Sequence, residues 1–180
     1  MQRRSFLSFT LSSAPLLGLA PFLPDDRVKK GVFVASGKDR FNEVPGSVKV
    51  SGKDTNGDLC IFEGYSSPTQ KKGWGPLLHL HHQQDEWFHI IEGEFLFQVG
   101  EEKFGLKAGD SLLAPRGIPH AFVKLTDDRS RMMTVYQPAG TMEAYFQAIR
   151  KFTGRPTDDD LTKLFLAHGM EVVGPRLTPE

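Results

Sequence analysis

The 180-residue chain has one cysteine, Cys60, and no excess of either charge: 22 Lys and Arg stand against 22 Asp and Glu. A single cysteine excludes an intramolecular disulfide and a cysteine-based zinc cluster. No long basic stripe is present, which argues against nucleic acid as a partner. Charged residues make up 24% and hydrophobic residues 39%, so the chain is not disordered, collagen-like or a coiled coil. Its length predicts one compact domain.

Long hydrophobic runs are also missing, and no run reaches the ~20 residues of a spanning helix. No permanent membrane anchor is therefore expected. The chain starts with Arg3-Arg4, then Phe6-Leu7 and an uncharged, serine-diluted stretch to Ala20. A positive start, a weakly apolar middle and a small-residue end are typical of an export signal, and the paired arginines resemble a twin-arginine signal. Residues 1–20 are thus predicted to be that signal and the protein to be periplasmic or extracellular. An uncleaved, unstructured N-terminus is the alternative.

Phenylalanine and glycine, by contrast, are abundant, with 14 and 18 copies. Many aromatics between turn-forming glycines predict short strands around an apolar interior. Residues 21–27 are predicted to be a linker, and Asn56-Gly57 a hairpin turn. The predicted strands are 28–34, 48–50, 59–65, 74–82, 86–91, 94–99, 103–106, 110–114, 120–125 and 131–137.

After Pro138 the apolar spacing becomes helical. Residues 141–152 and 157–168 are predicted as helices, with Thr141 and Thr157 as N-caps. The strands before them predict a β-sandwich or barrel, and the expected role of the helices is to pack against its outside or against a partner subunit. Residues 171–173 are expected to form a last short strand.

Histidines carry the strongest chemical signal. On a strand, His79 and His81 point to one face and His82 to the other. Glu86 follows where a hairpin would return, so it could supply an oxygen from the adjacent strand, and His120 lies on a later strand. Three imidazoles and one carboxylate suit a divalent transition metal and leave positions open for water or substrate. A His-x-His pair by itself is more often structural, so the surrounding framework matters.

That framework has two parts. The first is Gly73, five residues, His79-Leu80-His81, four residues, Glu86, six residues and Gly93. The second is Gly109, five residues, Pro115-Arg116-Gly117, two residues and His120, followed by Lys124. This pattern resembles the two conserved motifs of the cupin superfamily at every defined position except Lys124, where asparagine is usual. Lys124 is expected at the solvent end of its strand, with a positive charge near the pocket as the alternative.

The resemblance implies an all-β fold: a single cupin barrel (a double-stranded β-helix, or jelly roll) over residues 28–138. Residues 139–180 would be a C-terminal extension with two α-helices. It also implies the metal ligands, which are His79, His81, Glu86 and His120. The cofactor would be one divalent transition metal (Fe, Mn, Ni, Co or Zn).

Other candidate residues receive structural roles. His82, His89 and His168 match no ligand position. Asp85 is expected to be a solvated turn residue, with orientation of a metal ligand as the alternative. Cys60 is expected to be a buried small apolar residue. A set of apolar side chains is expected in the core: Phe88, Ile90, Phe95, Phe97 and Phe122.

Residues 75–88 and the tail after Pro138 look like bacterial single-domain cupins related to quercetin 2,3-dioxygenase. This resemblance implies a metal-dependent dioxygenase for a small aromatic or enol-bearing substrate. Glu86 would be both ligand and catalytic base, with a pKa raised by an apolar pocket. A non-redox isomerase, lyase or decarboxylase, or a non-catalytic binding module, is the alternative. Small cupins often pair, and uncovered strand edges and helix faces make a homodimer plausible.

Overall fold

The structure is a computed structural model that describes residues 27–38, 40, 47–65 and 71–179. The predicted export signal, residues 1–20, lies outside the described residues, as does all but the last residue of the predicted linker. The strands are β1 (Ser47–Val50), β2 (Cys60–Tyr65), β3 (Leu77–His81), β4 (Asp85–Glu92), β5 (Glu94–Val99), β6 (Glu102–Lys107), β7 (Ser111–Ala114), β8 (His120–Lys124), β9 (Arg131–Gln137) and β10 (Met170–Arg176). The helices are α1 (Met142–Ile149) and α2 (Asp158–Ala167).

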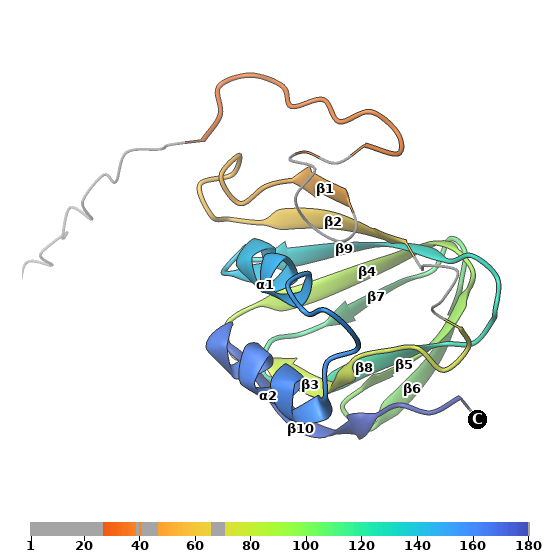
Figure 1. The fold of residues 1–180 in the computed structure, drawn as a ribbon. Coiled ribbons are helices and arrows are strands. Elements are labelled where there is room, and N and C mark those ends of the chain that lie inside the picture. The colour runs from red at the N-terminus through yellow and green to blue at the C-terminus, as the bar shows by residue number, and fades with distance from the viewer. Residues whose placement is uncertain (1–26, 39, 41–46, 66–70, 180) are drawn as a thin grey trace, which may run out of the picture.

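The strands form two antiparallel five-stranded sheets that face each other (Figure 1). One sheet has the order β1-β2-β9-β4-β7 and the other the order β10-β3-β8-β5-β6. Most neighbours within a sheet are distant in sequence, so consecutive strands repeatedly cross from one sheet to the other. This arrangement confirms the predicted all-β jelly roll with two C-terminal helices.

Glycines at the predicted turns adopt the backbone that the turns need. Asn56 and Gly57 have φ of 55° and 86°, which confirms the hairpin turn. The motif glycines also have positive φ: Gly73, Gly93, Gly109 and Gly117. Gly75 is required for a different reason: any side chain there would clash, because an added Cβ would lie 1.9 Å from the carbonyl oxygen of Phe122. This close approach lays the segment before β3 against β8.

The predicted strand over residues 28–34 is wrong. Residues 27–38 are described without a strand, and the side chain of Phe33 is 90% exposed. Within this segment Val28 donates one backbone hydrogen bond, to Asp54. Alternating β-branched residues predict a strand only where a neighbouring strand supplies the ladder, and none does so here.

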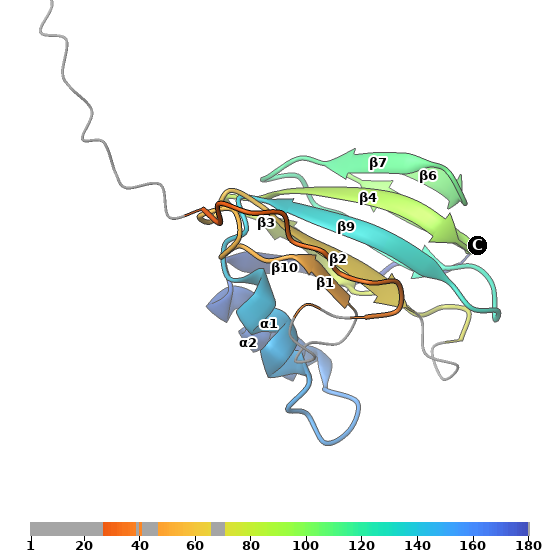
Figure 2. The same cartoon turned by 90° about the horizontal axis from the view of Figure 1, so that it is seen from above.

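The two helices do not pack on the outside of the barrel as expected. They lie side by side at one end of the sandwich, over the opening between the sheets (Figure 2), and their apolar residues enter the interior there. Thr157 caps α2 through a capping box with Asp160, as predicted. Thr141 occupies the N-cap position of α1, but its hydroxyl bonds to the carbonyl of His168 instead.

After α2 the chain returns to the barrel. β10 pairs with β3 and is longer than the three-residue strand predicted there. The chain between β9 and β10 therefore leaves one sheet, builds both helices over the opening and enters the other sheet. No helix among the described residues is long and apolar enough to cross a membrane.

The interior has two apolar clusters. The phenylalanine core contains Phe88, Ile90, Phe95, Phe97, Leu106, Ala114 and Met132. The helix-covered core contains Val48, Cys60, Phe62, Leu77, Tyr136, Ala139, Met142, Tyr145, Leu161, Phe165 and Met170. The four predicted metal ligands lie beside the helix-covered core.

Candidate metal centre

The four predicted metal ligands come together from both sheets. His79 on β3 is paired directly with His120 on β8, and His81 follows on the same face of β3. Glu86 lies on β4 of the opposite sheet, in register with Tyr136 on β9. The expectation that Glu86 would return on a strand adjacent to β3 is therefore wrong. The chain crosses between the sheets after β3, and the carboxylate reaches the histidines across the interior.

The donor atoms of His79, His81, Glu86 and His120 all lie within 4.8 Å of one another, and all four residues are buried. The other ring nitrogens are already used. Nδ1 of His79 lies 2.8 Å from the carbonyl oxygen of Leu77, and Nδ1 of His120 lies 3.0 Å from that of Ile118. Because a carbonyl only accepts, both Nδ1 atoms carry the proton, and both Nε2 atoms turn toward the cluster.

Gln84 fixes the third imidazole. Its Nε2 donates to the carbonyl oxygens of Pro138 and Ala139 at 2.8 and 2.9 Å. Its Oε1 therefore faces Nδ1 of His81 at 3.1 Å and accepts the proton of that nitrogen. Sequence reasoning did not identify Gln84. Its neighbour Asp85 was the residue considered for orienting a ligand, and nothing in the motif separates the two.

The cluster has the properties of a divalent metal site. Nε2 of His81 is buried without a hydrogen-bond partner, although Oε2 of Glu86 lies 3.2 Å away. Burial, with the neighbouring His120, lowers the pKa of His79 to about 3, which keeps that imidazole neutral. Three imidazoles with fixed tautomers and one carboxylate are a donor set that first-row divalent metals prefer.

Glu86 differs from the sequence expectation in its electrostatics. Burial alone would raise its pKa, as predicted. The close contacts of its Oε2 with Nε2 of His120, at 2.9 Å, and with Nε2 of His81, at 3.2 Å, outweigh burial and lower the pKa of Glu86 below its usual range. The carboxylate is therefore ionised, and its partners are the same Nε2 atoms that would bind a metal.

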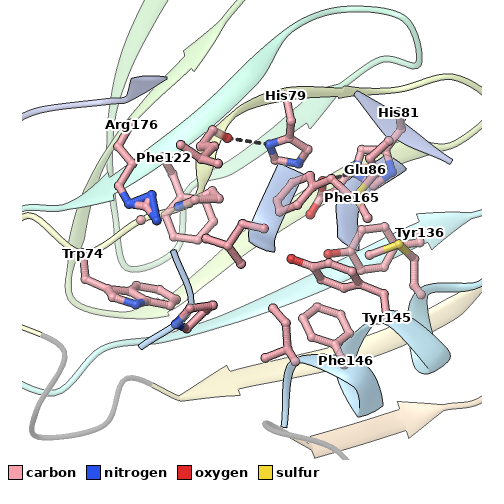
Figure 3. A pocket seen from close by; sticks show the side chains of 18 of the residues that line it. Trp74, His79, His81, Glu86, Phe122, Tyr136, Tyr145, Phe146, Phe165 and Arg176 are labelled. Carbon is pink, nitrogen blue, oxygen red and sulfur yellow. Dashed lines mark hydrogen bonds and ion pairs between the residues drawn. The ribbon is translucent and has the colours of Figure 1, made fainter. Parts of the chain in front are cut away.

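A cavity of about 310 Å³ opens from this cluster toward the helices (Figure 3). Its walls are mainly apolar and aromatic, and α1 and α2 supply one side of it. Around the cluster it is lined by Tyr136, Tyr145, Phe165 and Met170, and farther out by Trp74, Phe122 and Arg176 (Figure 3). Arg155 is also among the lining residues. Its volume is at the small end of ligand pockets, roughly 300–1,000 Å³.

Two tyrosines next to the cluster were missed as functional candidates. Burial and the neighbouring Glu86 raise the pKa of both Tyr136 and Tyr145, so both hydroxyls keep their protons. Tyr145 projects from α1 into the cavity (Figure 3). Its helical spacing alone identified it only as part of an apolar face. The site role becomes visible once α1 is placed over the opening.

Asp85 and Lys124 both differ from expectation. Asp85 accepts hydrogen bonds from the backbone N–H and side chain of Arg116, so it ties the start of β4 to the loop before His120. Lys124 is only 1% exposed, which makes the predicted solvent position wrong. The segment before β3 covers it, with backbone hydrogen bonds to Gly73 and Trp74 at both its carbonyl and its N–H. Lys124 does not line the cavity either.

The remaining histidines lie outside the cluster, as predicted. His82 is half exposed and lies 3.5 Å from Glu171, His89 bonds to Ser111, and His168 bonds to Thr141. Cys60 is fully buried, as expected. The predicted core phenylalanines are buried too, except that Phe122 is half-buried and also lines the cavity.

A comparison with known protein families matches the part of the chain that holds the metal cluster. The model of the Cupin domain family matches residues 69–136, which hold all four donor residues. This segment is a cupin domain. Both motifs quoted from the sequence, Gly73 to Gly93 and Gly109 to Lys124, lie within it, so the resemblance to the cupin superfamily is confirmed.

Relatives of the cupin domain cover only parts of the chain. An uncharacterized protein of Methanocaldococcus jannaschii, MJ1618, is 41% identical over 44 residues, which are 24% of this chain and 35% of that protein. The chain thus spans about a third of that relative. KdgF from Halomonas sp. is 26% identical, with 46% of this chain and 71% of KdgF covered at a TM-score of 0.41. Salicylate 1,2-dioxygenase from Pseudoaminobacter salicylatoxidans is 18% identical, with coverages of 48% and 24% and a TM-score of 0.41.

Proposed function

We propose that this cupin is a metal-dependent dioxygenase that acts on a small aromatic or enol-bearing molecule. The observation that carries the proposal is the position of the four donor atoms at the inner end of a small, mainly apolar cavity. A donor set of four leaves coordination positions open, and the cavity is where a second molecule can reach them. Aromatic walls suit a flat, conjugated substrate.

When bound, a redox-active divalent metal would supply the redox chemistry by which dioxygen reacts with the substrate. The residues of this chain have the other roles. His79, His81 and His120 would hold the ion, with the tautomer of His81 fixed by Gln84. Glu86 would be the fourth ligand. Because a bound ion would take over the histidine Nε2 atoms that now lower its pKa, its carboxylate could then accept the proton of a substrate hydroxyl.

Tyr145 retains its proton and faces the cavity, so it can donate a hydrogen bond to a substrate oxygen. The helices that carry it also exclude water from the inner end of the cavity. A water-poor site strengthens each of these electrostatic contacts.

The first experiment measures metal content in protein purified without chelator or a metal-binding tag. We expect about one equivalent of Fe, Mn, Co or Ni in the wild type, since a single four-donor site binds a single ion. H79A should lose the metal, while the control H82A, with a half-exposed histidine outside the cluster, should retain it.

Oxygen uptake is then measured with flavonols and simpler enols as substrates. The proposal is contradicted if the metal-loaded protein consumes no oxygen with any of them. One equivalent of zinc would favour an isomerase, lyase or decarboxylase instead. Absence of metal even after reconstitution would favour a binding module.

A further inference from the structure

The outer part of the cavity contains a charged residue, Arg176, at a position of β10 that faces the interior, where an apolar side chain is expected. Alternate residues of β10 face the interior, and Met170 at its start is buried beside the metal cluster. Arg176, six residues later, lines the same cavity near Trp74 and Phe122 (Figure 3). A guanidinium group on an inner face is costly unless its donors are satisfied.

Arg176 is only partly satisfied. Its Nη2 lies 2.8 Å from Oδ1 of Asp158, the first residue of α2, and that carboxylate is 69% exposed. Its Nη1 is buried and has no hydrogen-bond partner among the described residues. An exposed carboxylate is a weak partner for an arginine, and the second nitrogen remains available for a ligand.

The charge balance of the cavity is asymmetric. Arg155 also lines the cavity and forms no ion pair with the described residues, whereas the acidic lining residue, Glu86, lies at the inner end. With a divalent ion on Glu86, both ends of the cavity are positive. Such a cavity attracts anions and disfavours cations.

The register of the strands places the two ends along one wall of the cavity. Arg176 is paired with Leu77, which lies two residues before the metal-cluster residue His79 on β3. Arg176 and His79 both line the cavity, so a single elongated ligand can face both.

We propose that the ligand of this cavity is an aromatic or enolic acid whose carboxylate binds Arg176 while its hydroxyl faces the metal cluster. The inference rests on the proposed function in taking the His79 cluster as the end that binds the hydroxyl. Arginine suits this task because its planar fork matches a carboxylate. Arg176 thus determines substrate specificity.

The test compares 4-hydroxycinnamate with its neutral amide, 4-hydroxycinnamamide. Binding to the metal-loaded full chain is measured by isothermal titration calorimetry. Wild type should prefer the acid by about tenfold or more, because a charge-assisted hydrogen bond contributes about 1.5–3 kcal/mol, or roughly 10- to 150-fold. R176Q should lose this preference and still bind the amide within about twofold, as only the ionic contact is removed.

Two further variants keep the test decisive. D158N removes the competing carboxylate and should tighten acid binding several-fold without changing amide binding. R150Q removes an exposed arginine outside the cavity and should change neither. Metal content and thermal unfolding of each variant establish that it is folded and loaded.

Equal binding of the acid and the amide by wild type, no binding of either, or an unchanged preference in R176Q would overturn the inference. A preference for 4-hydroxyphenyl phosphate over 4-hydroxycinnamate would show that Arg176 binds a phosphate group and would overturn the proposed carboxylate ligand. Because binding is the readout, a carboxylate preference without oxygen uptake would contradict the dioxygenase proposal alone. Oxygen uptake with neutral substrates only would contradict the role of Arg176 alone.

Discussion

The two apolar clusters of the barrel are built from different kinds of residue. All members of the phenylalanine core lie on strands, and all are apolar. The helix-covered core holds tyrosines, a cysteine and methionines, and it borders the cavity and the four donors. The two clusters are therefore expected to contribute differently: the phenylalanine core contributes mainly packing, whereas the helix-covered core leaves a cavity beside the four donor residues.

Truncation of one phenylalanine in each core should give the largest difference in the loss of unfolding free energy. Phe97 is fully buried in the phenylalanine core, and F97A should cost about 3–5 kcal/mol of unfolding free energy, since a cavity replaces close packing. Phe165 packs edge-on against His79 and borders an existing cavity. F165A should therefore cost less, near or below the lower end of that range.

Chemical denaturation of both variants in the metal-free state measures these costs. Equal losses would mean that the two ends share the stabilising role. A greater loss for F165A would reverse the comparison.

A smaller effect is expected from the polar support of the metal cluster. Q84L removes the acceptor that fixes Nδ1 of His81, and it should weaken metal affinity about 10- to 100-fold, as such supporting contacts typically do. The adjacent exposed Gln83 provides the control Q83L. Competition with a chelator of known affinity measures both, and equal affinities of the two variants would assign no positioning role to Gln84.

The smallest effect on stability is expected from the ion pair between Asp85, next to Glu86, and Arg116. Hydrogen bonds from Arg116 lower the pKa of Asp85 to about 2, below its usual 3.8. A lowered carboxyl pKa stabilises the folded state above the usual pKa, and this contribution is lost as the pH falls from about 4 toward 2.

For a partly exposed pair the contribution is under about 1 kcal/mol. D85N should be less stable than wild type at pH 7 and should approach it at pH 3 in urea denaturation. A constant difference across this range would show that the ion pair adds nothing that depends on pH.

The sequence predicted the strands well because glycines and prolines mark their ends, and β5 and β9 have the predicted bounds. The four donors were identified because motif spacing is a local property. Residues 28–34 were predicted wrongly because strand formation depends on a neighbour, which a local pattern does not show.

Other features depended on the position of distant segments. Lys124 is buried because the segment at Gly73 and Trp74 covers it, and the helices lie over the opening because β10 returns to β3. Gln84 and Arg176 have no motif of their own. Their roles follow from contacts with Pro138, Asp158 and the cavity, which are far away in sequence.

The return of β10 to β3 has a mechanical consequence. Because α1 follows β9 in one sheet and α2 precedes β10 in the other, the helical pair is a covalent strap across the mouth of the barrel. The two sheets cannot splay apart at this end unless the strap lengthens or the hydrogen bonds between β10 and β3 break. A substrate of the proposed kind would therefore reach the His79 cluster past these helices, so its access would depend on the last 40 or so residues rather than on the barrel walls.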